Sequence, residues 1–407
     1  MSESVVPEGN EDAALGARRS LSLSRHLRSP RQWRGGPAWL VMIADVDAAS
    51  ILTALASGAA FRYDLVWFLV ALTLPLFFIQ DAAGQIGAVA GKGLGELARE
   101  HYSRRVAATV ALSMAIGDGA LYVAEYAGIA LGLGLFGVPP AISLPSAFVA
   151  HLALVAERRY AWVEKVLIGV SAGIVIALLV VAFHVGLAPY SPFGVSSEPA
   201  FYFLLAANTG AVVMPFMLFF QSSATATKHT SRAISRQSTL IGAVASETLM
   251  ILIVVIGAAI GVSLDVTSEA GFSSVLVSVL GASWAYVLAI GIVAAAFLAL
   301  VVISLGSAWG LTEAFGFSPK SIPWVYGVES VPAVVVPLLF PKLVVLVLAV
   351  MVAMVFVLIV PGVLVGRLAS DPRVMGAETL RPFWRSAYWT SLAVVIGVGI
   401  IGAAFAL

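Results

Sequence analysis

The sequence predicts an all-α membrane protein of about eleven transmembrane helices. Three observations indicate this fold class: the composition, the spacing of the apolar runs and the placement of the basic residues. Of the 407 residues, 60% are hydrophobic and 11% are charged, whereas an average soluble domain has about 25% charged residues. Mean hydropathy is +1.00. This composition is typical of a chain that crosses a lipid bilayer many times.

The apolar runs give the expected spans. A spanning helix needs about 20 largely apolar residues, because backbone N–H and C=O groups in lipid must pair within the helix. Runs of this kind, numbered here as spans 1 to 11, occupy residues 37–57, 64–88, 106–136, 139–156, 161–187, 200–224, 237–262, 280–310, 324–340, 342–366 and 385–407.

Basic residues set the expected orientation, because Lys and Arg collect in cytoplasmic loops. With the N-terminus inside, Arg62 and Lys342 are the two of the 23 basic residues that fall outside. The sequence therefore predicts a multi-pass protein of the cytoplasmic (inner) membrane, with its N-terminus in the cytoplasm and its C-terminus outside. Residues 1–35 lack apolar periodicity and are expected to form a disordered cytoplasmic tail, followed by one polytopic domain over residues 36–407.

Composition also excludes several classes of function. The chain has no cysteine, which excludes a disulfide framework and a thiolate metal site. Its net charge of +1 gives no reason to expect a nucleic-acid partner. No polar segment is long enough to form a separate enzyme domain, so we expect neither an enzyme nor a cofactor.

Ionisable residues inside the spans are the first functional candidates, because an unpaired charge in a bilayer costs several kcal/mol. Nearly all of them are acids: Asp45, Asp47, Asp81, Asp118, Glu125, Glu247 and Glu329. Without matching buried Lys or Arg they need protons or a bound cation, which indicates a cation pathway. Structural roles stay open for Glu329, near the start of its span, and for Asp118, which local pairing would also explain. Asp45 and Asp47 lie about 200° apart on a helix, so both can face one cavity only if the helix is unwound.

Span 6 contains a second signal. Pro215 follows the stretch Ala207–Met214, and a proline inside a helix removes a backbone donor and clashes with the preceding turn. A break there would free carbonyl groups near mid-membrane, where they are tolerated if they line a cavity or bind an ion. A simple kink is the alternative.

Short motifs then carry a family resemblance. Span 1 contains Gly36-Pro37-Ala38-Trp39-Leu40-Val41 and then Asp47-Ala48-Ala49-Ser50, and span 6 contains Gly210-Ala211-Val212-Val213-Met214-Pro215. Supporting stretches lie at residues 91–98, 124–128, 163–165 and 370–376. In this order the motifs resemble the Nramp family of divalent metal transporters over residues 36 to 385. The resemblance implies a LeuT-like fold, in which two inverted five-helix repeats with broken helices 1 and 6 surround a mid-membrane site, plus one extra helix. Residues 36–407 would then form a transporter domain.

The resemblance also implies a metal site. By motif position, the ligands are the side chains of Asp47, Ser50 and Met214 and the carbonyls of Ala44 and Ala211, and Asp45 is left outside the ligand set. The remaining candidates for the ion pathway or for coupling to a second ion are Glu125, Lys228, Asp45, Asp81, Glu247 and Gln221. The expected partners are a divalent metal ion, as transported substrate, and the bilayer.

The chain departs from the family pattern at several of these positions. Ala48 and Ala49 replace the family's Pro and Gly, and because both favour a helix we expect span 1 to be less broken. Ser50 replaces an amide ligand. Phe216 and Gln221 stand where the family has histidines, and Tyr122 replaces the first acid of span 3. Because the five His residues fall in the tail or near span ends by this interpretation, we expect weak or no proton co-transport.

Met214 bears on the substrate. A thioether suits Mn(II), Fe(II) and softer ions, whereas Mg(II) prefers oxygen ligands and keeps its waters, so the expected function is import of a Mn- or Fe-like divalent cation. The extra acids and the missing histidines favour the alternative, a Mg-type transporter without proton coupling. An organic-solute permease of the same fold is a further alternative, although Asp47 would repel a substrate carboxylate. A non-transporting receptor built on the same scaffold is the last.

Overall fold

The computed structural model describes residues 36–156, 160–261, 269–318, 321–340 and 342–406. The expected tail at 1–35 lies outside the described residues. Over the described ranges the regular elements are helices, in agreement with the predicted class. In chain order they are α2 (Gly36–Ala44), α3 (Ala48–Phe61), α4 (Val66–Ala90), α5 (Leu94–His101), α6 (Arg104–Gly134), α7 (Pro140–Ala156), α8 (Tyr160–Val185), α9 (Pro199–Val212), α10 (Pro215–Thr227), α11 (Arg232–Ile260), α12 (Glu269–Leu280), α13 (Ala282–Phe315), α14 (Ile322–Leu339), α15 (Leu343–Val357), α16 (Ile359–Ala369), α17 (Pro372–Met375), the 3₁₀ helix η4 (Gly376–Glu378) and α18 (Pro382–Ala406).

The expected spans correspond to these helices. Among the described residues, nine helical stretches are long and apolar enough to cross a membrane, and the bent pair α2 and α3 makes a tenth. The fourth expected span is α7, whose 17 residues fall short of the roughly 20 needed to cross upright. The eleven apolar runs are thus all helical, and one of them is short.

Span 1 is broken, as the family resemblance implied, although the helix-favouring Ala48 and Ala49 stand where the family has Pro and Gly. Helix α2 ends at Ala44, α3 begins at Ala48, and the two axes meet at 52°. The physical reason is a cap. The side chain of Asp47 accepts a hydrogen bond from the backbone N–H of Ser50. The carboxylate of Glu125 accepts hydrogen bonds from the backbone amides of Ala48 and Ala49.

Span 6 is broken where Pro215 predicted it. Helix α9 ends at Val212 and α10 begins at Pro215, so Val213 and Met214 lie outside both helices with extended backbone. Pro215 is the first residue of α10, where its missing N–H and its fixed φ suit a helix start. The two halves together form one 29-residue apolar stretch.

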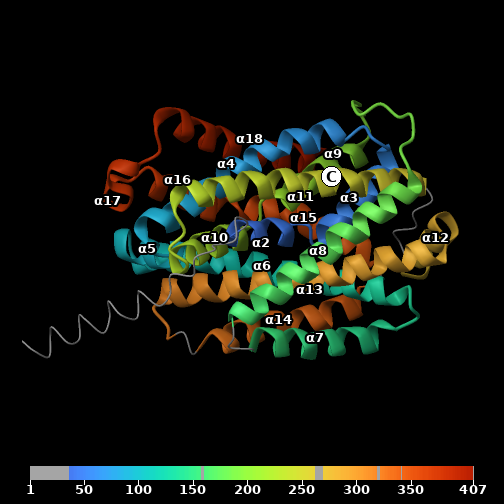
Figure 1. Cartoon of the computed structure of the whole chain (residues 1–407), viewed down its shortest axis with the longest axis horizontal. Helices are drawn as coiled ribbons and strands as arrows, with labels where there is room; N and C mark the ends of the chain where they lie inside the picture. Colours follow the sequence, from blue (N-terminus) through green and yellow to red (C-terminus); the bar gives the residue numbers. More distant parts are fainter. Residues whose placement is uncertain (1–35, 157–159, 262–268, 319–320, 341, 407) are drawn as a thin grey trace, which may run out of the picture.

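The two broken spans lie inside the bundle (Figure 1). Helix α11 packs along α2, α3 and α4, while α6 packs against α13 and α15 against α9. Glycines allow the closest approaches. A Cβ atom on Gly257 would lie 2.3 Å from the Leu55 carbonyl oxygen, and one on Gly210 would lie 1.7 Å from that of Met351. The core therefore holds the broken spans by backbone-to-backbone contact.

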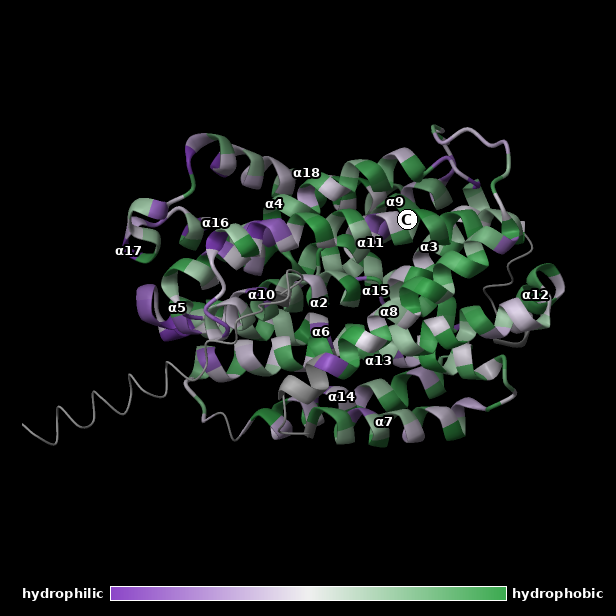
Figure 2. Cartoon of the chain, in the orientation of Figure 1, coloured by the Kyte–Doolittle hydropathy of each residue, from purple (hydrophilic) through white to green (hydrophobic). Residues whose placement is uncertain are grey.

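Polar residues gather at one end of the bundle. Figure 2 shows hydrophilic residues around α5, α17 and the start of α11, while hydrophobic residues cover the lengths of the long helices. Lys92 pairs with Glu100 at 2.6 Å and Arg373 pairs with Asp371 at 2.7 Å in this region. Three of the regions predicted to be cytoplasmic, those at α5, at α17 and at the start of α11, thus share one end of the molecule.

Candidate metal-binding site

The centre of the candidate site is the start of α3, where Asp47 is the N-cap residue. Its Oδ1 accepts a hydrogen bond of 2.6 Å from the Ser50 amide. Its Oδ2 is buried and has no hydrogen-bond partner. A buried carboxylate oxygen without a partner is costly, and a bound cation would satisfy it. The fully buried Asp47 is therefore ready to bind a positive charge.

The break in span 1 exposes a carbonyl beside this carboxylate. Ala44 is the last residue of α2, and the last carbonyls of a helix have no partner within it. In an unbroken helix the Ala44 oxygen would accept from the Ala48 amide, but that amide donates instead to Oε2 of Glu125 at 3.1 Å. The Ala44 carbonyl is thus available to an ion.

Span 6 supplies the second half of the predicted donor set. The Ser50 hydroxyl donates to the Ala211 carbonyl oxygen at 3.5 Å, which brings the start of α3 against the end of α9. Met214 lies in the break after α9 and is fully buried. Its backbone N–H points to the sulfur of Met217 at 3.4 Å. The structure therefore brings the Ser50 and Ala211 positions together and places Met214 in the adjoining break.

Two further carboxyls lie near the break in span 1. Asp45 and Glu247 are 3% and 2% exposed, and the strongest charge interaction of Asp45 is with Glu247, followed by that with Asp47. Oδ1 of Asp45 and both oxygens of Glu247 are buried without hydrogen-bond partners. Within the described ranges, however, no three His, Asp or Glu side chains converge on one metal position. Among the described residues, the acids near this break therefore do not form a cage of carboxylates.

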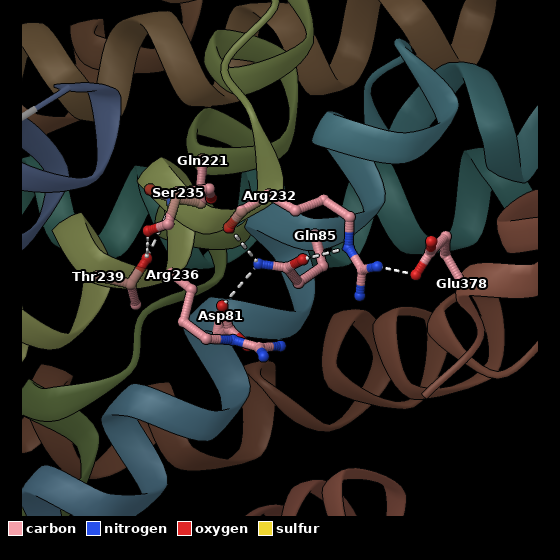
Figure 3. Close-up of polar contacts among 8 residues, drawn as sticks. All are labelled: Asp81, Gln85, Gln221, Arg232, Ser235, Arg236, Thr239 and Glu378. Atoms are coloured by element: carbon pink, nitrogen blue, oxygen red, sulfur yellow. Dashed lines mark hydrogen bonds and ion pairs between the residues drawn. The ribbon is translucent and has the colours of Figure 1, made fainter. Parts of the chain in front are cut away.

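Asp81 lies elsewhere, which corrects the expectation that the acids of the spans lack a basic partner. Figure 3 shows its carboxylate facing Arg236 on α11, with Oδ2 at 2.9 Å from Nη2. Its other oxygen accepts from Gln85 at 2.9 Å, and Gln85 in turn contacts Arg232, which pairs with Glu378. Asp81 is therefore part of a neutralised network between α4 and α11.

Gln221 and Lys228 are not beside the site either. Gln221 lies seven residues beyond Met214 and thus about 10 Å further along α10. Its side-chain amide donates to the Thr239 hydroxyl at 3.3 Å. Lys228 is the C-cap of α10, about 21 Å along the axis from Met214. Lys228 thus lies at the far end of α10, while Glu125 binds the backbone amides of Ala48 and Ala49 at the break in span 1.

His151 is a buried residue that the sequence interpretation missed. It lies inside α7 at 0% exposure and not at a span end. Its Nδ1 is 3.0 Å from the Tyr126 hydroxyl and its Nε2 is 2.8 Å from the Ser304 hydroxyl, which also accepts from Tyr122 at 2.9 Å. A His inside an apolar run is the signal that could have identified it.

Asp118 and Glu329 belong to the same side of the bundle, between α6, α13 and α14. Ser307 donates to Oε1 of Glu329 at 2.8 Å, and both oxygens of the fully buried Asp118 lack a partner. The structure therefore places Glu329 against α13, and not in the interfacial position that its place in the sequence allowed. These residues form a second buried polar region on this side of the bundle.

Comparison with known proteins identifies the family of this chain. The family described as "Natural resistance-associated macrophage protein-like" matches residues 38–404. The divalent metal cation transporter MntH of Bacillus subtilis is 31% identical over 198 residues, which are 47% of this chain and 47% of that protein. The matched stretch thus spans about half the length of this relative.

Solved structures share the fold. The manganese transporter of Eremococcus coleocola superposes with a TM-score of 0.79 at 18% identity, over 98% of this chain and 89% of that one. MhsT, solved with L-phenylalanine, gives 0.62 at 15% identity over 92% and 99% of the two chains. At these identities the likeness shows the fold, and it confirms the predicted LeuT-like class. Because the family match covers nearly the whole chain, the protein belongs to the natural resistance-associated macrophage protein (Nramp) family.

Proposed function

We propose that this chain is a secondary transporter, and not an enzyme, that imports a divalent metal cation of the Mn(II) or Fe(II) type across the cytoplasmic membrane. The observation that carries the proposal is the unpartnered, fully buried Oδ2 of Asp47 at the break in span 1. The metal is the transported substrate, and no cofactor is needed for its passage. The names of the relatives, MntH and a manganese transporter, support this substrate class.

The proposed ligands combine hard and soft donors. Asp47 supplies the full negative charge, while Ser50 and the carbonyls of Ala44 and Ala211 supply neutral oxygens. Met214 supplies a thioether, which contributes to binding of Mn(II), Fe(II) or Cd(II) and gives little to Mg(II) or Ca(II). This sulfur is the reason to prefer a transition metal.

A Mg-type transporter without proton coupling is the second candidate. The observation that favours it is the presence of Asp45 and Glu247 near the same break, with three carboxylate oxygens that lack partners. Mg(II) is typically held by one or two carboxylates and several waters. An organic-solute permease is less well supported, because Asp45 and Glu247, near Asp47, would repel a substrate carboxylate.

The proposed orientation has the N-terminus in the cytoplasm and the C-terminus outside. It is supported by the collection of α5, α17 and the start of α11 at one end of the bundle, which is the end that carries the predicted cytoplasmic loops. Loops that are rich in Lys and Arg are favoured on the cytoplasmic side of the membrane.

Uptake of radioactive Mn(II) in proteoliposomes, and its competition by Mg(II) and by Cd(II), test the proposal. We expect Asp47→Ala to reduce Mn(II) uptake to the level of empty vesicles, because it removes the single full charge of the proposed ligands. The matched control is Asp371→Asn, which alters an N-cap carboxylate in the loop before α18. Uptake by Asp47→Ala at the rate of the control would refute the site, and stronger competition by Mg(II) than by Cd(II) would favour the second candidate.

A further inference from the structure

The N-terminus of α3 is buried, and its first three backbone amides all donate hydrogen bonds to carboxylates. The first amides of a helix have no partner within it, and Ala48, Ala49 and Ser50 are each 0% exposed. The Ala48 amide donates to Oε2 of Glu125 at 3.1 Å and the Ala49 amide to Oε1 at 3.3 Å. The Ser50 amide donates to Asp47. The first three amides are thus all satisfied, two of them by one residue of another helix.

Local sequence does not account for the break in span 1. Ala48 and Ala49 are good helix formers, and no Pro or Gly interrupts residues 38–57. In a continuous helix the amides of Ala48 and Ala49 would bond to the carbonyls of Ala44 and Asp45. The carboxylate of Glu125 competes for the same two amides. Each of its two oxygens accepts from one of these amides, so both N–H groups are satisfied without the carbonyls of Ala44 and Asp45.

The packing of α6 against α3 is suited to this contact. Gly128 lies one turn beyond Glu125 on α6, and a Cβ atom there would lie 2.3 Å from the Cβ of Ala48. Glycine at this position therefore lets α6 approach α3 closely enough for the carboxylate to reach the amides. Glu125 lies 77 positions after Ala48 and 76 after Ala49, so the contact joins distant parts of the chain.

We infer that Glu125 is a positioning residue that holds span 1 broken. By taking the amides of Ala48 and Ala49, it releases the carbonyl of Ala44 and sets the direction of Asp47. Glu125 thus interrupts the helix from another span, whereas a Pro-Gly pair interrupts a helix from within its own sequence. Its effect on metal binding rests on the proposed function, whereas its effect on the helix does not. Both its oxygens accept from backbone amides of α3, and this contact is how it acts on the helix.

Hydrogen exchange of the full-length protein in detergent, measured by mass spectrometry on peptides covering residues 44–52, tests the helix without any metal. We expect Glu125→Ala to change amide exchange in this segment by tenfold or more, and Glu125→Gln, which keeps one acceptor oxygen, to change it less. The matched control is Glu329→Gln, which removes a buried carboxyl that contacts a serine hydroxyl and no amide of α3. It should leave the segment unchanged.

A rescue variant then separates positioning from other roles. Ala48→Pro removes the amide that needs Glu125 and fixes φ at the value of a first helical residue. We expect Glu125→Ala to weaken Mn(II) binding, measured by calorimetry, by roughly ten- to a hundredfold, and Ala48→Pro in the same chain to recover most of it. Failure of this rescue, or unchanged exchange in Glu125→Ala, would overturn the inference. If wild-type protein binds no Mn(II) while the exchange results hold, the proposed function fails and the role of Glu125 in the helix stands.

Discussion

Replacement of Gly210 by alanine is the sharpest test of how tightly the second helix break is held. A Cβ atom there would lie 1.7 Å from the Met351 carbonyl oxygen and 2.8 Å from its carbonyl carbon. Real Cβ contacts are essentially never shorter than 3.0 Å. The backbones of α9 and α15 must therefore separate by about 1.3 Å, the difference between 3.0 and 1.7 Å. Neither atom belongs to a flexible side chain, so the strain cannot be relieved by a rotamer change.

The expected cost follows from this displacement. Overpacking a well-packed core costs typically 1–3 kcal/mol, and a shift near 1 Å at a binding site costs about a hundredfold in rate. Gly210 adjoins Ala211, so we expect Gly210→Ala to lose about 1–3 kcal/mol of stability and most Mn(II) uptake. Thermal unfolding and vesicle uptake measure the two effects.

The control for this variant is Gly173→Ala on α8. A Cβ atom on Gly173 would meet nothing within 4 Å, so the same chemical change meets no neighbour. We expect the control to unfold and to transport as wild type does. If Gly210→Ala and Gly173→Ala have equal unfolding temperatures and equal uptake, the close approach of α9 to α15 does not shape the site and the reasoning is wrong.

Four further predictions follow from the site and its surroundings. Met214→Ala should weaken Mn(II) and Cd(II) uptake relative to Mg(II), and an unchanged ratio would make the thioether a packing group. Arg236→Gln should lose about 3–5 kcal/mol of stability because it leaves Asp81 buried and unpaired, and adding Asp81→Asn should recover part of it in thermal unfolding. A reporter fused after Leu407 should lie outside and one before residue 36 inside, and the same side for both would contradict the orientation. Metal uptake should acidify vesicles weakly or not at all, and strong metal-dependent acidification seen with a trapped pH dye would contradict this.

The sequence predicted the fold because its signals are local. Apolar runs, basic loops and Pro215 each act within about 20 residues, and the helices and the break in span 6 follow them. The break in span 1 was expected from the family resemblance and not from local sequence, because Glu125, which takes the amides at the break, lies on another span and binds backbone atoms. Hydrogen bonds to backbone leave no pairing signal in a single sequence.

The partners of the buried acids were also beyond the sequence. Asp81 pairs with Arg236, which the distribution of basic residues assigned to a cytoplasmic loop. The contact depends on how α4 lies against α11. Lys228 was a candidate for the ion pathway by motif position, and the length of α10 separates it from the break at Met214. The motif positions of Asp47 and Met214 remain predictions, supported by their places at the two breaks.

The two halves of span 1 are held against α11 with different stiffness. On the α3 side, Gly58 and Gly257 put backbone against backbone, with a Cβ on Gly58 only 2.1 Å from the Val254 oxygen. On the α2 side, Gly242 faces the side-chain carbons of Met42, and the nearest backbone atom is 3.6 Å away. Methionine is flexible and re-packs readily. A displacement of α3 would therefore have to carry α11 with it, whereas α2 meets α11 through a flexible side chain, so that the N-terminal half of this span is the mechanically more compliant one.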